Sequence, residues 1–204
     1  MIRQFIWLEP GLIFALILAN GFFAAAEIAI IATRKSRIDA LLEKGAKAAA
    51  AVGRLKNDPD RFLATVQIGV TVVSSLASAI GGAAAIGYLQ PKIQALPIPL
   101  FSRWSELIAI LVVVLPISYL SLVLGELVPK SLALRFSERI ACLTAPLIDF
   151  LSRISAPLVK LLTASSNAML WIFGGKENEG ASFISVDEVK FLIREGDARG
   201  IFNE

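Results

Sequence analysis

The stretch "GLIFALILANGFFAAAEIAIIAT", residues 11 to 33, contains one charged side chain, that of Glu27. A helix needs about 20 mainly apolar residues to cross the hydrocarbon core of a bilayer. Two more runs of this kind follow, at about 62 to 89 and about 107 to 128. The whole chain is 56% hydrophobic and only 18% charged, with a mean hydropathy of +0.70. The sequence therefore predicts an all-α membrane protein with three transmembrane helices.

The loops between these runs differ in charge. Residues 34 to 61 contain eight Lys or Arg, whereas residues 90 to 106 contain only Lys92 and Arg103. Because basic loops stay on the cytosolic side, we expect a multi-pass protein of the plasma membrane with its N-terminus outside and its C-terminus in the cytosol. The basic loop also contains an alanine- and lysine-rich stretch ended near "KNDPD", which predicts a cytosolic helical hairpin over 34 to 61.

The chain changes character after the third run. We expect a transmembrane domain over 1 to 136, a juxtamembrane helix over 137 to 175 and the start of an acidic cytosolic helical linker over 176 to 204. Charged residues recur at helical spacing in the middle segment, and prolines interrupt it: Asp149, Arg153 and Lys160, with Pro146 and Pro157. This pattern favours an amphipathic helix lying in the membrane interface over a fourth crossing. The linker opens with "SVDE" at 185 to 188, a capping box.

Several classes of function find no support in the composition. The chain has no histidine and a single cysteine, Cys142, so histidine-based metal sites, histidine-dependent triads and an intrachain disulfide are excluded. No nucleophile is accompanied by a base, and we expect no enzymatic activity. The net charge is only +3, and the basic residues flank apolar spans, a pattern that fits the lipid bilayer better than nucleic acid.

One carboxylate near the end of the third run needs an explanation, that of Glu126 in "LGELVPK". Pro129 has no N–H, so it cannot bond to the carbonyl of Gly125 four residues earlier. That carbonyl and Glu126 together offer oxygen ligands to a hard cation such as Mg²⁺ or Ca²⁺. Ion sites in transporters use such broken helices. The alternative is a proline-terminated helix in which Glu126 reaches the interface and pairs with Lys130.

Polar residues also form stripes on the three predicted spans. Span two has one at helical spacing, with Ser75 beside it: Gln67, Thr71, Ser74 and Ser78. Asn20, Ala24 and Glu27 share a face of span one, and Ser118, Ser121 and Gly125 a face of span three. The three faces can converge in a bundle, which makes Gly125, Glu126, Ser74 and Ser75 candidate metal ligands. Glu27, Thr71, Ser78 and Ser121 become candidates for an ion path. The alternative is that the small residues and hydroxyls only let the helices pack closely. For Glu27 it is a carboxylate that reaches the interface or pairs with another helix.

Three stretches resemble a known family: "FFAAAEIAI" at 22 to 30, "NDPDRFLATVQIG" at 57 to 69 and "GELVPKSLALRFSERIA" at 125 to 141. They look like the membrane domain of the CNNM/CorC family of magnesium transporters, also labelled hemolysin-like proteins, and the likeness covers residues 10 to 204. The resemblance implies a homodimer with three membrane helices per chain and a cytosolic helical belt. It also implies a linker to ATP-binding CBS domains. We expect the CBS module to be missing from residues 1 to 204, and therefore expect no ATP on them.

The chain departs from the family pattern at three positions. Family members that bind Mg²⁺ have Ser where this chain has Ala24, and Asn where it has Val70 and Ser74. The resemblance itself implies a transporter or exporter of a divalent cation, with Mg²⁺ as the first candidate and Na⁺ as a candidate coupling ion. The transporter would work by alternating access in a dimer. The departures leave the cation, the direction and the coupling open. The alternative is a membrane protein that senses cations or binds partners without transport.

Overall fold

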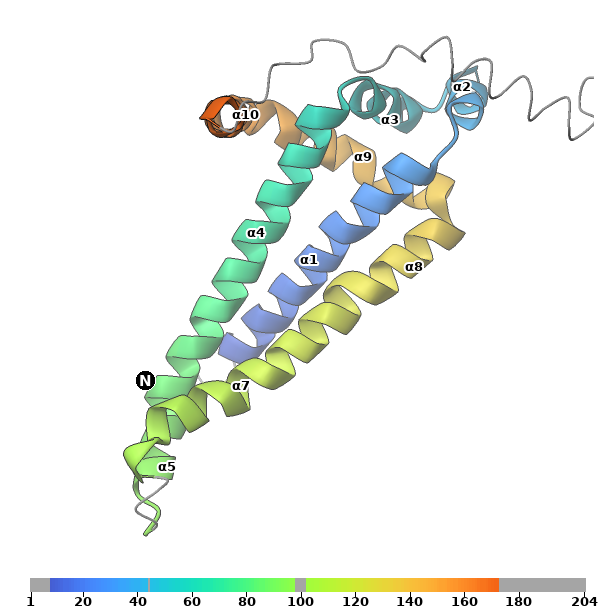
Figure 1. Cartoon of the computed structure of the whole chain (residues 1–204). Helices are drawn as coiled ribbons and strands as arrows, with labels where there is room; N and C mark the ends of the chain where they lie inside the picture. Colours follow the sequence, from blue (N-terminus) through green and yellow to red (C-terminus); the bar gives the residue numbers. More distant parts are fainter. Residues whose placement is uncertain (1–7, 44, 98–101, 173–204) are drawn as a thin grey trace, which may run out of the picture. The chain divides into compact units, whose positions relative to one another are not determined.

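The computed structural model describes residues 8–43, 45–97 and 102–172. The chain divides into two compact units, Met1–Lys160 and Leu161–Glu204. Every element in the described ranges is a helix, as Figure 1 shows, so the prediction of an all-α fold is confirmed.

Three long helices make up the body of the first unit. The first is α1 (Leu8–Ala32). The second is α4 (Pro59–Ala84), which continues through η2 (Ala85–Leu89) and α5 (Gln90–Gln94). The third is α7 (Ser105–Leu122), which continues through η3 (Val123–Leu127) and α8 (Val128–Arg135). In the described part of the chain these are the three helices that are singly long and apolar enough to cross a membrane, as the sequence predicts.

All three helices extend beyond the ranges expected from hydropathy, the first by beginning at Leu8. The second begins earlier because Pro59 occupies its first turn and the Asp58 side chain accepts a hydrogen bond from the Arg61 backbone N–H. The third does not end before Pro129. Its turn at Val123–Leu127 is a π-helix, and the wider turn lets the helix continue past a residue that has no N–H.

α1 lies between the other two long helices and is the most buried of the three. It contacts α4 on one side and η3 with α8 on the other (Figure 1). Gly21 allows the second contact, because a Cβ added there would lie 3.0 Å from the Leu124 carbonyl oxygen and 3.0 Å from Pro129 Cγ. α1 and η3 therefore pass each other at backbone distance.

Shorter helices pack at the end of α1 where Ala32 lies. The stretch 34 to 61 folds largely into α2 (Lys35–Glu43) and α3 (Lys47–Asn57). Both α1 and α3 contact α9 (Ser137–Ile154). Small and branched apolar side chains fill the space between them and form the buried core of this end: Ala29, Ile30, Ala49, Val52, Leu55, Ala141, Ala145 and Ile148.

The segment predicted as a juxtamembrane helix, 137 to 175, is largely helical but interrupted. α9 ends at Ile154, and α10 (Ala156–Ile172) begins after Ser155. α9 and α10 together are long and apolar enough to cross a membrane, whereas each helix alone is not. Their position in the interface stays a prediction. The predicted linker at 176 to 204, with its capping box at 185 to 188, lies outside the described residues.

Candidate functional site

The Gly125 carbonyl has a hydrogen-bond partner on another helix. Asn20 Nδ2 of α1 donates to the Gly125 oxygen of η3 at 3.1 Å. Asn20 is 6% exposed, and Gly125 is buried. Because Pro129 supplies no N–H, this oxygen has no i→i+4 donor, and the side-chain amide of Asn20 provides one from another helix.

A second side chain joins this contact from α4. Ser74 Oγ donates to Asn20 Oδ1 at 3.4 Å, a long and therefore weak hydrogen bond. The three residues come from α1, α4 and η3, and we call them the three-helix contact: Asn20, Ser74 and Gly125. It brings together a carbonyl oxygen, an amide oxygen and a hydroxyl, the neutral oxygen ligands that hard cations bind.

Glu126 has a different partner. Its carboxylate forms an ion pair with Lys130 Nζ at 2.6 Å, one turn along the same helix. The Glu126 side chain is 44% exposed. Among the described residues, the carboxylate makes no hydrogen bond to Asn20 or Ser74. This is the pairing expected if Glu126 reaches the interface. The ion pair uses Oε1, and in the described part of the chain Oε2 makes no hydrogen bond.

The other predicted site residues lie around the three-helix contact without joining it. Ser75, Thr71 and Ser78 are exposed on α4, whereas Ser74 faces α1. Glu27 of α1 and Ser121 of α7 are half-buried. In the described part of the chain, none of these five hydrogen bonds to Asn20 or Gly125. The predicted convergence of three polar faces therefore involves one residue from each helix.

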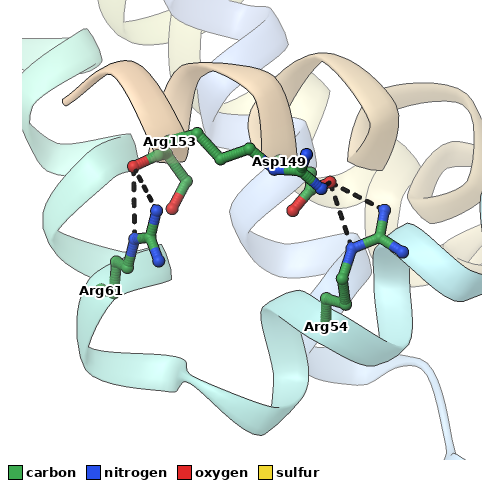
Figure 2. Close-up of polar contacts among 5 residues, drawn as sticks. Arg54, Arg61, Asp149 and Arg153 are labelled. Atoms are coloured by element: carbon green, nitrogen blue, oxygen red, sulfur yellow. Dashed lines mark hydrogen bonds and ion pairs between the residues drawn. The ribbon is translucent and has the colours of Figure 1, made fainter. Parts of the chain in front are cut away.

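Ion pairs connect α3 to α9 at the other end of α1. Asp149 Oδ2 accepts hydrogen bonds from Arg54 Nε and Nη2, at 3.2 and 2.8 Å, and from Arg153 Nη2 at 2.8 Å. The Asp149 side chain is 14% exposed. Arg54 holds the pKa of Asp149 below its ordinary value, mainly through these hydrogen bonds, with Arg153 adding to the effect. Figure 2 shows Arg54 reaching α9 from α3.

The start of α4 is tied to the same helix. Arg61 Nε and Nη2 donate to the Ser152 carbonyl at 3.2 and 3.0 Å. Figure 2 shows Arg61 reaching α9 from the start of α4. One turn further, the hydroxyls of Thr65 and Ser155 lie 3.3 Å apart. These bonds satisfy carbonyl and hydroxyl groups near the end of α9. Any displacement of α4 along its axis must therefore break them or move α9 with it.

Two features of this arrangement were not assigned from the sequence. Asn20 shares a face with Ala24 and Glu27, but nothing in its own span indicates that its amide bonds to a carbonyl freed by Pro129. The contact of Arg54 with Asp149 joins residues 95 positions apart. The signal available for the first was an uncharged amide in an apolar span, which needs partners in a membrane.

Residues 11–204 match the family described as the cyclin M transmembrane N-terminal domain, CNNM. Over its full length the chain is 39% identical to the UPF0053 protein sll0260 of Synechocystis, covering 45% of that protein. It is 32% identical to the UPF0053 protein YhdP of Bacillus subtilis over 95% of the chain and 43% of that protein. The chain thus spans less than half the length of these relatives. It is also 27% identical, over 79% of its length, to a protein of Haemophilus influenzae named polyamine export protein.

Proposed function

This chain belongs to the family of the cyclin M transmembrane N-terminal domain, and from that membership we propose that it moves a cation across the membrane through the three-helix contact. The observation that supports the proposal is the hydrogen bond from Asn20 to the Gly125 carbonyl. Carbonyls that a broken helix leaves free coordinate ions in transporters, and Pro129 removes the i→i+4 donor to the Gly125 oxygen.

The chemistry of the contact suits a hard cation as the transported substrate. In the structure the Gly125 oxygen accepts a hydrogen bond from Asn20 Nδ2, which carries a partial positive charge. The Glu126 carboxylate pairs with Lys130 Nζ, which carries a full positive charge. A cation that replaced both donors would meet a carbonyl and a carboxylate, with Asn20 Oδ1 and Ser74 Oγ beside them once the amide turned. The amide from α1 can then substitute for the asparagine that this chain lacks in span two. We propose Mg²⁺ as the first candidate and Na⁺ as a coupling ion.

Exposed polar side chains on α4 support the proposal of a dimer. Gln67, Thr71, Ser75 and Ser78 are exposed and share one side of a membrane-spanning helix. Polar groups facing hydrocarbon are unfavourable, and hydroxyls and amides in spans hydrogen bond across helix interfaces. A second copy of the chain packed along this side of α4 would cover them, and alternating access would then involve both copies.

The orientation belongs to the same proposal. α2 and α3, which carry most of the basic residues of the first loop, lie at the end of α1 opposite Glu9. Under the positive-inside rule this end is cytosolic, which puts the start of α1 outside the cell.

A second candidate substrate is an organic polycation. The relative from Haemophilus influenzae is named polyamine export protein. A primary ammonium needs the same oxygen acceptors as a metal ion, and the Glu126 carboxylate already binds one in Lys130. A membrane protein that senses a cation without moving it is a third possibility, and it differs from the first two by binding without flux.

The experiment is calorimetric titration of Mg²⁺ into the detergent-solubilised chain at fixed pH. We expect wild type to bind, and Glu126→Gln and Asn20→Leu to bind about tenfold or more weakly. Pro129→Ala restores an N–H that competes for the Gly125 carbonyl and should weaken binding less. Ser118→Ala, which removes an exposed hydroxyl of α7, serves as the matched control. If wild type and all variants bind alike, the three-helix contact is not the site.

A further inference from the structure

An apolar cavity of about 470 Å³ lies among the three long helices, at the end far from α2 and α3. It runs between the first half of α1, the end of α4 with η2, and the middle of α7. From Glu9 to Ile17 it extends about 12 Å along α1. Its walls are stripes of apolar side chains at helical spacing: Ile13 and Ile17, Ala84, and Val113 and Ile117.

The cavity is produced by a close contact followed by a small residue. A Cβ added at Gly81 would lie 2.7 Å from Ile117 Cδ1, so α4 and α7 touch at that point. One turn later Ala84 has only a methyl group to place between the helices. Ile13 and Ile17 form the buried wall, with exposures of 8% and 2%.

The chemistry of the walls decides what can fill this space. Of the lining residues only Glu9 and Tyr88 have polar side-chain ends, and they lie at the first turn of α1 and in η2. The remaining walls are hydrocarbon and offer water no hydrogen bonds. A water needs two to four polar partners to occupy a cavity, and a hydrated cation needs more. The filling must therefore be apolar.

The cavity is also continuous with the surface that faces the bilayer. Phe14 and Leu120, which line it, are 49% and 42% exposed. Next to it on α7, Val112 and Leu115 are exposed apolar residues of a membrane-spanning helix. The medium around such a surface is lipid acyl chain, which can enter the cavity without crossing a polar barrier.

We infer that an acyl chain of a bilayer phospholipid occupies this cavity, with its headgroup beside Glu9 and Tyr88. A tyrosine at the membrane interface suits the headgroup level, and the apolar walls below it suit the chain. Ile17 lies one turn from Asn20, and its carbonyl oxygen lies 3.2 Å from a Cβ built on Gly125. The cavity therefore ends about one turn of α1 away from the three-helix contact. The inference does not depend on cation transport.

The test uses a photoreactive lipid. The chain is reconstituted in phosphatidylcholine vesicles that contain a small fraction of phosphatidylcholine with a diazirine in one acyl chain. After irradiation, labelled residues are identified by mass spectrometry of peptides. We expect label concentrated on the stripes of α1 and α7 that face the cavity, above the label on the exposed side of α7 at Val112 and Leu115.

Two pairs of variants make the result specific. Ala84→Phe and Val113→Phe fill the cavity, whereas Ala83→Phe and Val112→Phe add the same ring to neighbouring exposed positions. We expect cavity labelling to fall severalfold in the first two and to stay at the wild-type level in the controls. Circular dichroism measures the helical content of each variant, and its elution volume in size-exclusion chromatography measures its size. Wild-type values of both establish that the variant is folded.

Three outcomes would overturn the inference. Label spread evenly over the exposed apolar faces means that the cavity holds no lipid. Cavity label that is unchanged in both filling variants means that the labelled site lies elsewhere. Cavity label that appears only after residues 1–7 are removed means that the protein's own first residues occupy the space.

Discussion

Asn20 Nδ2 donates a hydrogen bond over 3.1 Å to the carbonyl oxygen of Gly125, a residue 105 positions further along the chain. The bond ties α1 to η3 at the oxygen that Pro129 leaves without an i→i+4 donor. Ser74 extends it to α4. Because the donor is a side chain that can rotate, the oxygen can be released to another positive group without unwinding the helix. This separates the three-helix contact from ordinary packing of small residues.

The close approach of α1 to η3 should tolerate no larger side chain at Gly21. Gly21→Val places atoms against the Leu124 carbonyl and Pro129, and we expect it to lower the free energy of unfolding by about 1–3 kcal/mol. Thermal unfolding followed by circular dichroism in detergent measures the change. Gly82→Val is the matched control, since a Cβ added at Gly82 meets nothing within 4 Å. Equal melting temperatures for the two variants would contradict the packing described.

Stability should depend on pH through Asp149. Its pKa is lowered in the folded chain, so the carboxylate adds stability above the ordinary pKa of about 3.9, and this is lost as pH falls through the folded value. Asp149→Asn should reduce the free energy of unfolding by a few tenths to about 1 kcal/mol near neutral pH, since Arg54 and Arg153 are exposed. The difference should be constant from about pH 7 to 5 and shrink below the ordinary pKa.

Denaturation at each pH gives this difference directly. Asp60→Asn removes an exposed carboxylate that pairs with no Lys or Arg in the described part of the chain, and it provides the control. If the difference in free energy of unfolding between wild type and Asp149→Asn grew as pH fell, the pKa of Asp149 would not be lowered in the folded chain.

How far the sequence predicts this fold depends on the range of the interactions. Hydropathy alone locates the three spans, because each is a continuous property of about 20 residues. It does not show that the third helix continues past Pro129 to Arg135, because that depends on a π-helical turn at Val123–Leu127. Hydropathy also does not predict which residue of the polar stripe on span two faces α1. That depends on the rotation of α4, and the Gly69 and Gly81 contacts with Phe23 and Ile117 bring Ser74 inward.

The proposed dimer predicts a specific cross-link. In a chain with Cys142→Ser, Thr71→Cys adds a single thiol to the exposed polar side of α4. Under mild oxidation in vesicles we expect a disulfide-linked dimer, seen as doubled mass on a non-reducing gel. Ser118→Cys in the same background places the thiol on an exposed part of α7. Cross-linking through Ser118→Cys with none through Thr71→Cys would move the interface away from α4.

The proposed orientation predicts opposite labelling of two exposed positions. In the same Cys142→Ser background, Gln94→Cys of α5 should react with a membrane-impermeant maleimide added to intact cells. Ser36→Cys of α2 should react only after the cells are permeabilised, because the basic loop faces the cytosol. The reverse pattern would invert the topology.

The most direct measurement of the central claim is cation flux into proteoliposomes that contain a Mg²⁺-sensitive dye, with parallel vesicles tested for Na⁺ and for a radiolabelled polyamine. We predict that wild type admits Mg²⁺ above the rate of protein-free vesicles. Asn20→Leu and Glu126→Gln should fall to that background, while Ser118→Ala should match wild type. If the chain transports the polyamine and not Mg²⁺, and both variants lose this transport, the three-helix contact is still the transport path but its substrate is the polyamine. The account is contradicted if wild type moves none of the three, or if Asn20→Leu and Glu126→Gln transport as wild type does.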